Sequence, residues 1–464
     1  MGAFVGRRDY LKLLDDTYND PKFKACALIG RRRIGKSALI NEFVKGKDHL
    51  RFQFIHADVD TNLAYASEVM SEYLRRKIRY DDVASFFIDL EGVTSSRKVI
   101  LVIDEYPYIC DEEGTVSSML QHLIDLRIGE SFVILCGSSV KMMEREVSEY
   151  DRPLFGRLRP IRVKEMTFDE CREFHPGMSD EEQLKLYLTV GGVPFYHSDT
   201  DAKNYRDYVA RYILAEHAVF AEEGENSVNR ELSPAEDIYT ILDHIPPTGV
   251  SLPDLRASTG MDKSTCARCI KTMEDAGVLT FVNPMVGAPR KPRYVTISDP
   301  VIAFAFQVLR KKRVTFGDPY ASYDRMSNLI DSFLGRRFER FCEEYIRASY
   351  VTSSIGKWWG KTSVMEVDGT VHGENREIDV VAEVSDGRND VVLFVECKFW
   401  NRPVGYGVLN DLDESVALIR NRRNHRRMLI SRSGFEEDLR NDSDPNLILV
   451  DLKTLLGGGP APEL

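Results

Sequence analysis

The sequence predicts an α/β protein of several domains that begins with a parallel sheet. Three short apolar runs, at residues 24–30, 98–104 and 131–137, each end in glycine or aspartate. Such runs are typical of strands that are buried on both faces of a parallel sheet. Residues with helical spacing follow the first run, and about seventy residues of helical and strand pattern precede the second, which suits the long connections that parallel strands need. The first domain is therefore expected to be a sheet covered by helices.

The pattern of the chain changes several times along its 464 residues, which are too many for one ordinary core. These changes divide it into an α/β core at 1–165, a helical lid at 166–228, a helical segment with a hairpin at 229–313 and a second α/β domain at 326–464.

The composition is that of a soluble globular protein, with 43% hydrophobic and 29% charged residues. No apolar run approaches the ~18 residues of a membrane span, and the N-terminus lacks a signal peptide. We therefore expect a cytoplasmic protein without a membrane partner. The eight cysteines are scattered, so no disulfide framework is expected. Cys266 and Cys269 are interpreted as helix positions one turn apart, because a lone pair cannot complete a zinc site.

The net charge of −11 gives no overall attraction to nucleic acid. Basic residues nevertheless cluster locally, at 31–33, 310–313 and 420–427. A local basic face is compatible with an acidic total.

Residues 24–46 have the order strand, glycine-rich loop, helix, and the loop is GRRRIGKS from Gly30 to Ser37. Its glycines let backbone N–H groups face phosphate oxygens, and the helix N-terminus adds the positive end of its dipole. We expect Lys36 to reach the β and γ phosphates of ATP and Ser37 to ligate Mg²⁺. The residues predicted to bind the nucleotide in this loop are Gly30, Arg33, Ile34, Gly35, Lys36, Ser37 and Ala38.

The next two apolar strands also end in polar side chains. Asp104 and Glu105 follow the strand at 98–104. Asp104 is expected to hold Mg²⁺ through water, and Glu105 to polarise the attacking water as a catalytic base. A solvated strand end is the alternative. Ser138 or Ser139 follows the third strand, and because parallel sheets bind ligands at strand carboxyl ends, we expect Ser138 to sense the γ-phosphate or that water.

Six motifs occur in order: FVGRRDYL at 4–11, the glycine-rich loop, IDE at 103–105, LCGSS at 135–139, PLFGRL at 153–158 and VGGVP at 190–194. This order resembles the prokaryotic ATPases of the AAA+/STAND type known as archaeal ATPases, over roughly the first 220 residues. The resemblance implies that the adenine is bordered by Phe4, Val5, Gly6 and Arg7, and that Gly191–Pro194 lies in the lid near the nucleotide. It also implies that Arg157 acts on the γ-phosphate of a neighbouring subunit, and hence that ATP promotes self-association. A surface salt bridge is the alternative for Arg157.

Residues 233–298 show three helical patterns followed by two strands around a Pro/Gly/basic loop. This order resembles a winged helix, which members of the same family carry at this place. The residues suited to phosphate and base contacts are Lys263, Arg268 and Lys271 on the last helix and Arg290, Lys291 and Arg293 in the loop. Contact with DNA or RNA and packing against protein are the two alternatives.

Two short motifs, EID at 377–379 and ECK at 396–398, mark the C-terminal domain. Residues two apart on a strand share a face, so Glu396 and Lys398 lie together, and Asp379 meets them if its strand pairs alongside. The carboxylates would bind Mg²⁺ or Mn²⁺, and the lysine would activate water for attack on a phosphodiester. An ordinary cross-strand ion pair is the alternative.

With GRRFE at 335–339 on an amphipathic helix at 329–348 and KWW at 357–359, these motifs resemble the PD-(D/E)XK restriction-endonuclease-like fold. More narrowly, they resemble the nuclease-like domain that is commonly fused to archaeal-type ATPases, over residues 329–453, with Ile378 in place of the proline. The resemblance implies that Glu339 is a further metal ligand and Lys398 a catalytic residue. The basic run Arg420–Arg427 is expected on a later helix, facing a nucleic-acid backbone.

The predicted fold is thus a P-loop NTPase parallel sheet with a helical lid, then a winged helix, then a restriction-endonuclease-like α/β domain. The predicted function is ATP hydrolysis that governs nucleic-acid binding or cleavage. The alternatives are a STAND-like switch, in which nucleotide controls assembly with protein partners and the C-terminal domain only binds, and ATP held structurally without turnover.

Overall fold

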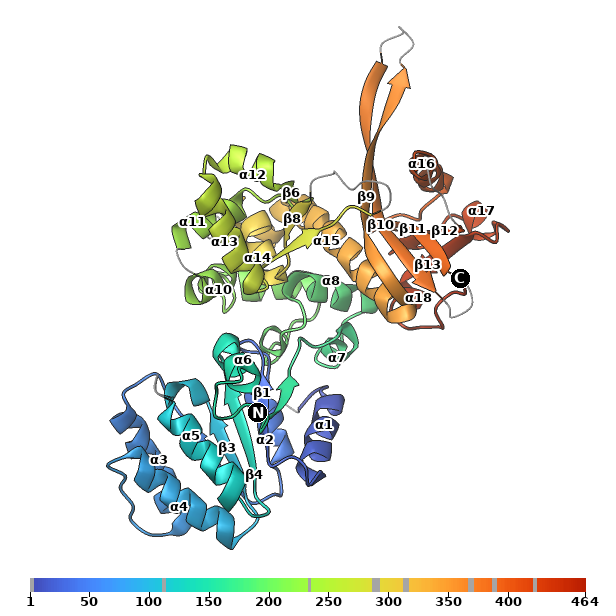
Figure 1. Ribbon diagram of the computed structural model, residues 1–464. Coiled ribbons are helices and arrows are strands. Elements are labelled where there is room, and N and C mark those ends of the chain that lie inside the picture. Colours follow the sequence, from blue (N-terminus) through green and yellow to red (C-terminus); the bar gives the residue numbers. More distant parts are fainter. Residues whose placement is uncertain are drawn as a thin grey trace. The chain divides into compact units, whose positions relative to one another are not determined.

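The computed structural model describes residues 4–110, 114–232, 235–285, 293–311, 317–365, 371–385, 390–419 and 424–464 (Figure 1). The chain forms two compact units. The first comprises Met1–His175 and Gly192–Thr200, and the second comprises Pro176–Gly191 and Asp201–Leu464.

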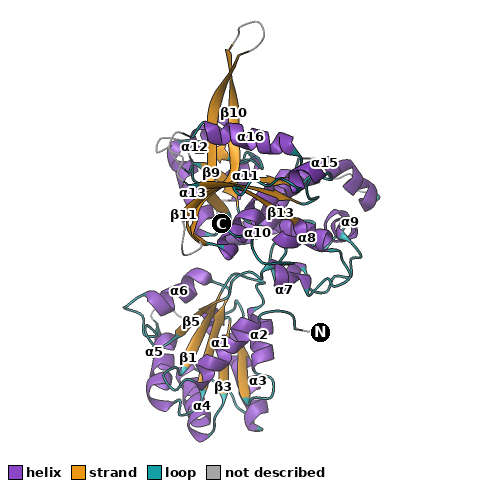
Figure 2. Cartoon of the chain, turned by 90° about the vertical axis from the view of Figure 1, so that its right-hand side faces the viewer, coloured by secondary structure: helices purple, strands orange, loops and turns teal. Residues whose placement is uncertain are grey.

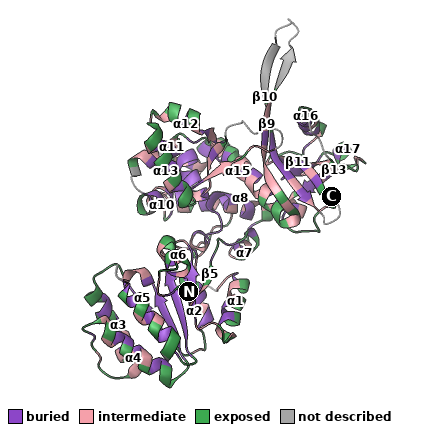
Figure 3. Ribbon diagram, in the orientation of Figure 1, coloured by how far each residue is buried: buried purple, intermediate pink, exposed green. Residues whose placement is uncertain are grey.

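The first unit is built on a five-stranded sheet in the order β2-β3-β4-β1-β5, with every neighbouring pair parallel. Its strands are β1 Ala25–Ile29, β2 His49–Gln53, β3 Ile100–Asp104, β4 Phe132–Gly137 and β5 Arg159–Arg162. Every residue of β1, β3 and β4 is buried, as Figure 3 shows in purple. The predicted parallel sheet is therefore confirmed, and its three central strands are the three apolar runs of the sequence.

Helices lie on both sides of this sheet (Figure 2). They are α1 Arg8–Asn19, α2 Lys36–Phe43, α3 Val59–Leu74, α4 Val83–Ser96, α5 Thr115–His122, α6 Val140–Ser148 and the short α7 Phe168–Arg172, with single turns at Tyr106–Tyr108, Leu123–Arg127 and Pro194–Tyr196. Several helices begin at a side-chain cap, for example Asp58 before α3 and Asp82 before α4. One face of the sheet packs with α3, α4 and α5 in a continuous apolar core.

The second unit begins with helices around a small antiparallel sheet. The helices are α8 Asp180–Val190, α9 Tyr205–Val209, α10 Glu223–Glu231, α11 Ala235–Asp243, α12 Leu252–Thr259, α13 Lys263–Asp275, α14 Pro300–Phe304 and α15 Pro319–Ser349, with π turns at Ala210–Leu214 and Ala305–Leu309. The sheet has the order β6-β8-β7, with β6 Val250–Ser251, β7 Leu279–Val282 and β8 Tyr294–Ile297.

The helix expected at 329–348 is longer than predicted, because α15 starts at Pro319, before the expected start of the C-terminal domain at residue 326. Asp318 caps this helix by accepting a hydrogen bond from the Tyr320 N–H, and proline suits the first helical position. The cap and the proline therefore set a start that the polar composition of this part of the chain concealed.

A second, mixed sheet follows α15, in the order β13-β12-β11-β10-β9. Its strands are β9 Val351–Met365, β10 Val371–Ser385, β11 Asp390–Lys398, β12 His425–Ser431 and β13 Leu447–Asp451, and its helices are α16 Tyr406–Ala417, α17 Glu437–Arg440 and α18 Leu452–Leu455. Strands β9, β10 and β11 are antiparallel, whereas β11, β12 and β13 are parallel. The β9–β10 hairpin projects from the sheet (Figure 1), and α16 packs on its base in a separate apolar core.

The expected position of the basic run 420–427 on a helix is wrong for its described part. Residues 420–423 lie outside the described residues, and Arg426 and Arg427 belong to strand β12, since α16 already ends at Ala417. The apolar residues that follow them pair in parallel with β11, and the two arginines continue this pairing at the start of β12. Arg427 forms ion pairs with Asp413 at 2.7 Å and with Asp444.

Among the described helices, none is long and apolar enough to cross a membrane.

The VGGVP turn gives a test of the packing of the first unit. A Cβ at Gly192 would lie 1.9 Å from the carbonyl oxygen of Met166, whose N–H donates to the Gly192 carbonyl at 2.7 Å. We expect Gly192→Ala to destabilise the first unit by about 1–3 kcal/mol, measured by calorimetry. Gly177→Ala is the control, because a Cβ there meets nothing within 4 Å. Equal stability of the two variants would contradict the close approach.

Candidate functional site

The glycine-rich loop joins the end of β1 to the start of α2, and each of its glycines has a distinct reason. Gly35 precedes α2 with φ 91°, a left-handed conformation that side chains rarely adopt. At Gly30 a Cβ would lie 2.7 Å from the carbonyl oxygen of Val163, because the chain leaving β5 passes close by. The loop backbone therefore depends on glycine at both ends.

Lys36 is the cation of this loop, and it is 7% exposed. Its Nζ donates to the carbonyl oxygens of Gly30 at 2.6 Å and Arg31 at 3.0 Å. Burial lowers the pKa of Lys36, because the ammonium has lost water. A buried ammonium that donates its hydrogen bonds to neutral carbonyls fits an anionic partner such as a phosphate.

A hydroxyl and a carboxylate meet beside the loop. Ser37, at the start of α2, donates from Oγ to Oδ2 of Asp104, the last residue of β3, at 3.2 Å. Asp104 is 2% exposed and also forms an ion pair with Arg51 of β2. Hard oxygen donors of this kind fit Mg²⁺. Sequence reasoning missed Arg51. The signal for it in the sequence is its position between two residues of β2 that are buried.

Glu105 and Ser138, which come from the ends of neighbouring strands β3 and β4, are brought together. The Glu105 carboxylate accepts from the Ser138 N–H at 3.0 Å and from its Oγ at 2.8 Å. Glu105 has φ 53°, which is a strained conformation for a residue with a side chain, and such strain gathers at functional sites. The two hydrogen bonds hold the carboxylate at the carboxyl edge of the sheet, one residue beyond Asp104.

The N-terminal residues lie against the same loop. Arg7 is buried, and its guanidinium donates to the carbonyls of Ile34 at 3.0 Å and Lys164 at 2.6 Å. Burial lowers the pKa of Arg7. Phe4 and Val5 are half-buried. The arginine therefore braces the glycine-rich loop, and contact of residues 4–7 with adenine stays a prediction.

The remaining predicted nucleotide contacts surround the loop. The guanidinium of Arg33 lies over the ring of Phe195 at 4.0 Å, and Pro194 would touch a Cβ at Gly35 at 3.5 Å. Part of the VGGVP turn thus lies against the loop. Ala38 is exposed on α2.

Arg157 forms an ion pair within its own chain. Its Nε lies 2.8 Å from the Asp125 carboxylate, and Nη1 donates to the Pro153 carbonyl at 3.2 Å. This is the salt bridge of the alternative interpretation, and the action of Arg157 on a neighbouring subunit stays a prediction.

The predicted nucleic-acid contacts of the helical segment lie on its surface where they are described. Lys263, Arg268 and Lys271 are exposed on α13, and Arg268 lies 3.8 Å from Asp237. Arg293 is exposed and lies over the ring of Phe281 at 4.5 Å. Arg290 and Lys291 fall outside the described residues.

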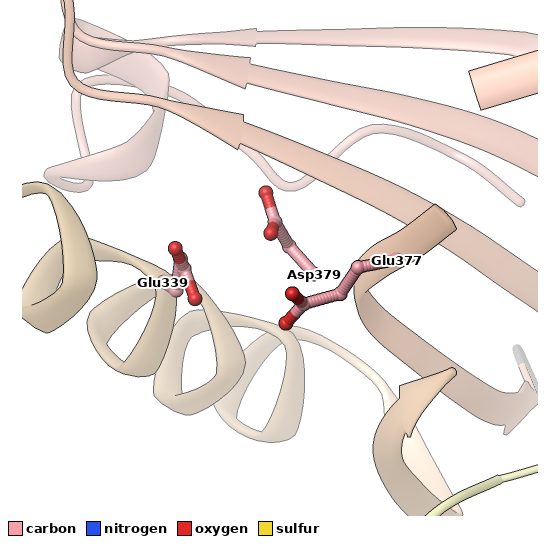
Figure 4. A group of neighbouring side chains, drawn as sticks. All are labelled: Glu339, Glu377 and Asp379. Carbon is pink, nitrogen blue, oxygen red and sulfur yellow. The ribbon is translucent and has the colours of Figure 1, made fainter. Parts of the chain in front are cut away.

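An acidic cluster lies where α15 meets the second sheet (Figure 4). Glu339 of α15 and Glu377 and Asp379 of β10 point toward one another, and their carboxylate oxygens lie within 4.8 Å of each other. The Asp379 carboxylate also accepts a hydrogen bond from the Cys397 N–H at 2.9 Å, which connects β10 to β11. Glu377 was not predicted as a ligand, although its spacing of two from Asp379 on a strand is the signal that would have found it.

Glu396 and Lys398 of β11 form an ion pair with each other beside this cluster. Burial, reinforced by the negative charge of Asp379, raises the pKa of Glu396 to about 8. Asp379 is thus close enough for its charge to act on Glu396, as expected if the strands carrying EID and ECK are neighbours. Within the described residues, however, the three acids whose carboxylates lie close enough to hold one metal ion are Glu339, Glu377 and Asp379.

Lys357 of β9 is a residue of this site that sequence reasoning missed. Its Nζ lies 2.6 Å from the Glu339 carboxylate and 2.9 Å from that of Glu377, and Arg336 donates to Glu339 at 2.9 Å. Burial raises the pKa of Glu339, and the neighbouring Asp379 adds to this effect. Three carboxylates at this spacing fit a divalent cation, which would compete with Lys357 for the same oxygens.

Comparison with known proteins gives two matches along the chain. Residues 4–196 match a family described as an ATPase domain predominantly from Archaea. Residues 304–410 match a family of archaeal and bacterial proteins of unknown function. The first match spans the glycine-rich loop, Asp104, Glu105 and Ser138. The family match and this geometry together support a nucleotide-binding ATPase domain of the archaeal type.

The relatives and solved structures add the following. An uncharacterized protein of Methanocaldococcus jannaschii is 25% identical over 410 residues, covering 85% of this chain and 87% of the relative. An uncharacterized ATP-binding protein of the same organism is 41% identical over 44 residues, covering 10% and 75% of the two chains. A Walker-type ATPase of Pyrococcus abyssi has a TM-score of 0.48 at 14% identity, covering 66% of this chain and 96% of that one.

The carboxylate of Glu105 gives the test of this site. We expect Glu105→Gln to slow phosphate release from ATP by about 10²–10⁴-fold, because the amide cannot accept the proton of the attacking water. Binding of a fluorescent ATP analogue should be retained. Glu72→Gln, at an exposed position of α3, is the control. Equal hydrolysis rates in Glu105→Gln and the wild type would remove Glu105 from the mechanism.

Proposed function

We propose that ATP binding and hydrolysis in the first unit control nucleic-acid binding or metal-dependent cleavage by the second unit. The observation that carries this proposal is the convergence of Glu339, Glu377 and Asp379 next to the Glu396–Lys398 pair. Three acids beside a lysine, drawn from one helix and two neighbouring strands, match the demands of phosphodiester hydrolysis.

The topology supports this reading of the second unit. One long helix, α15, precedes the antiparallel strands β9, β10 and β11, and the acids lie on α15 and on the central strands. This order supports a PD-(D/E)XK nuclease-like domain. The order α11, β6, α12, α13, β7, β8 supports a winged helix before it.

In the first unit the chain's own groups would act in sequence on ATP. The backbone of Gly30–Ser37 would hold the phosphates, and Lys36 would transfer its hydrogen bonds from the loop carbonyls to phosphate oxygens. Ser37 and Asp104 would hold Mg²⁺, which supplies positive charge to the phosphates when bound. Glu105, oriented by Ser138, would accept the proton of the attacking water.

In the second unit Glu339 and Asp379, with Glu377 or Glu396, would hold Mg²⁺ or Mn²⁺. A bound ion there supplies Lewis-acid polarisation of the phosphodiester and a lower pKa for water. Lys398, held by Glu396 in an ion pair, would orient the water.

A second candidate is a STAND-like switch, in which nucleotide controls assembly with partner proteins and the C-terminal domain binds without catalysis. The observation that favours it is the neutralisation of the acids by Lys357 and Arg336 within the chain. Such a network is what a purely structural ion-pair cluster would show.

Cleavage separates the two candidates. We expect Mg²⁺- or Mn²⁺-dependent cleavage of DNA or RNA that is lost by more than about 10²-fold in Asp379→Ala and in Lys398→Ala, since each removes a group that acts on the reacting phosphate. Asp390→Ala, at the exposed start of β11, is the control. Absence of cleavage on single- and double-stranded DNA and RNA, with and without ATP, would favour the switch.

Self-association gives an independent test of the role proposed for Arg157. If Arg157 completes a neighbour's nucleotide site, a non-hydrolysable ATP analogue should raise the mass measured by light scattering. Lys36→Ala should abolish the increase, because the loop then loses its phosphate-binding cation. A monomer both with and without the analogue would contradict the action of Arg157 between subunits.

A further inference from the structure

A cavity of about 1070 Å³ lies within the second unit and contains the acidic cluster. Its walls are the three-stranded sheet, α15 and the β9–β10 hairpin. Glu339, Glu377 and Asp379 are part of its lining. The cavity is partly open to solvent, and the acids lie in a recess that these elements bound.

One wall of the cavity is fixed to the hairpin by main-chain hydrogen bonds. The Lys357 N–H donates to the Asn283 carbonyl at 3.3 Å, and the Met285 N–H donates to the Lys357 carbonyl at 2.7 Å. The chain that continues from β7 thus runs alongside β9 at the residue whose side chain touches Glu339 and Glu377. This segment bounds the approach to the acids on one side.

Two aromatic rings line the same cavity. Tyr294 of β8 and Trp359 of β9 pack edge to face, with ring centroids 4.9 Å apart, and both are half-buried. Aromatic faces at a groove stack nucleic-acid bases, at about 1–3 kcal/mol per base, with little regard to sequence. The rings offer a binding surface to a base that has left a helix.

The lining is also rich in cations. Among the described residues that form it, seven are basic and five acidic. Arg340 and Arg347 lie on α15, where they form ion pairs with Glu344 at 3.9 Å and with Glu343 at 2.9 Å. Lys361 is exposed on β9, two residues beyond Trp359. Cations beside an aromatic pair are the combination that tracks a phosphate backbone while its bases stack.

We infer that this cavity binds a single-stranded segment of nucleic acid, with a base against Trp359 and Tyr294 and backbone phosphates near Arg340, Arg347 and Lys361. The inference rests on the proposed function and names its substrate class, because a strand held in this way presents a phosphodiester to the acidic cluster. A duplex keeps its bases stacked inside and offers no free base face to Trp359. A duplex would also be sterically blocked by residues 283–285 at the wall of the cavity.

Binding is to be measured with the full chain carrying Asp379→Ala and without divalent metal, so that cleavage plays no part. Fluorescence anisotropy of a short labelled single strand, as DNA and as RNA, is compared with a hairpin duplex of the same composition. We expect the single strand, of either sugar, to bind at least about tenfold more tightly than the duplex. Trp359→Leu should weaken single-strand binding by about tenfold or more, as should Lys361→Glu.

Lys203→Glu is the matched control, because Lys203 is exposed in the second unit and outside the cavity, and it should leave binding unchanged. Equal or tighter binding of the duplex would overturn the inference. Single-strand binding that is unchanged in both Trp359→Leu and Lys361→Glu would also overturn it. Because Lys361 is exposed, misfolding does not account for a loss of binding in Lys361→Glu. Trp359-dependent binding in a protein that never cleaves would support the inference while removing nuclease activity from the proposed function.

Discussion

Burial of charge is the constraint on which both sites of this protein depend. Removing an ion from water costs several kcal/mol, and the cost is met only by partners of opposite charge or by good hydrogen bonds. Lys36 and Asp104 are buried at the carboxyl edge of the parallel sheet, and Glu339 and Asp379 are buried where α15 meets β10. The two sheets place these residues, and the partners of each charge then decide what the site is able to bind.

The two sites meet this constraint in opposite ways. In the nucleotide site the Lys36 ammonium donates its hydrogen bonds to carbonyl oxygens, the charges of Glu105 and Asp104 act on it, and burial lowers its pKa. A phosphate bound beside Lys36 would stabilise the charged form of its ammonium. In the acidic cluster Lys357 already lies between Glu339 and Glu377. A divalent cation therefore has to displace an existing ion pair. Binding there is a competition between the metal ion and the Lys357 ammonium for the same carboxylates.

The sequence predicted the parts of the two sites that depend on local patterns, and it missed those that depend on contacts between residues distant in the chain. Local patterns predicted β1, β3 and β4, and because parallel strands bring their carboxyl ends to one edge, they also placed Glu105 and Ser138 at the same edge of the sheet. Arg51 and Lys357 were missed, since each meets an acid only through strand pairing or helix packing across a long sequence distance. The strand β12 was missed for a similar reason: its arginines suggested a solvated helix, whereas pairing with β11 decided the outcome. The start of α15 depended on a local cap, Asp318, that the polar surroundings obscured.

Lys357 also shows how the pieces of the second unit depend on one another. Its side chain holds two acids, and its main chain holds residues 283–285, so one residue joins the acidic cluster to the segment that follows β7. A shift of β9 at this point would alter both sets of contacts together, because both start from the same residue. The charge state of the cluster and the shape of the cavity are therefore not independent properties. A ligand that changes the position of residues 283–285 would change the competition for Glu339 and Glu377, and a cation that displaces Lys357 would act on the cavity wall in return.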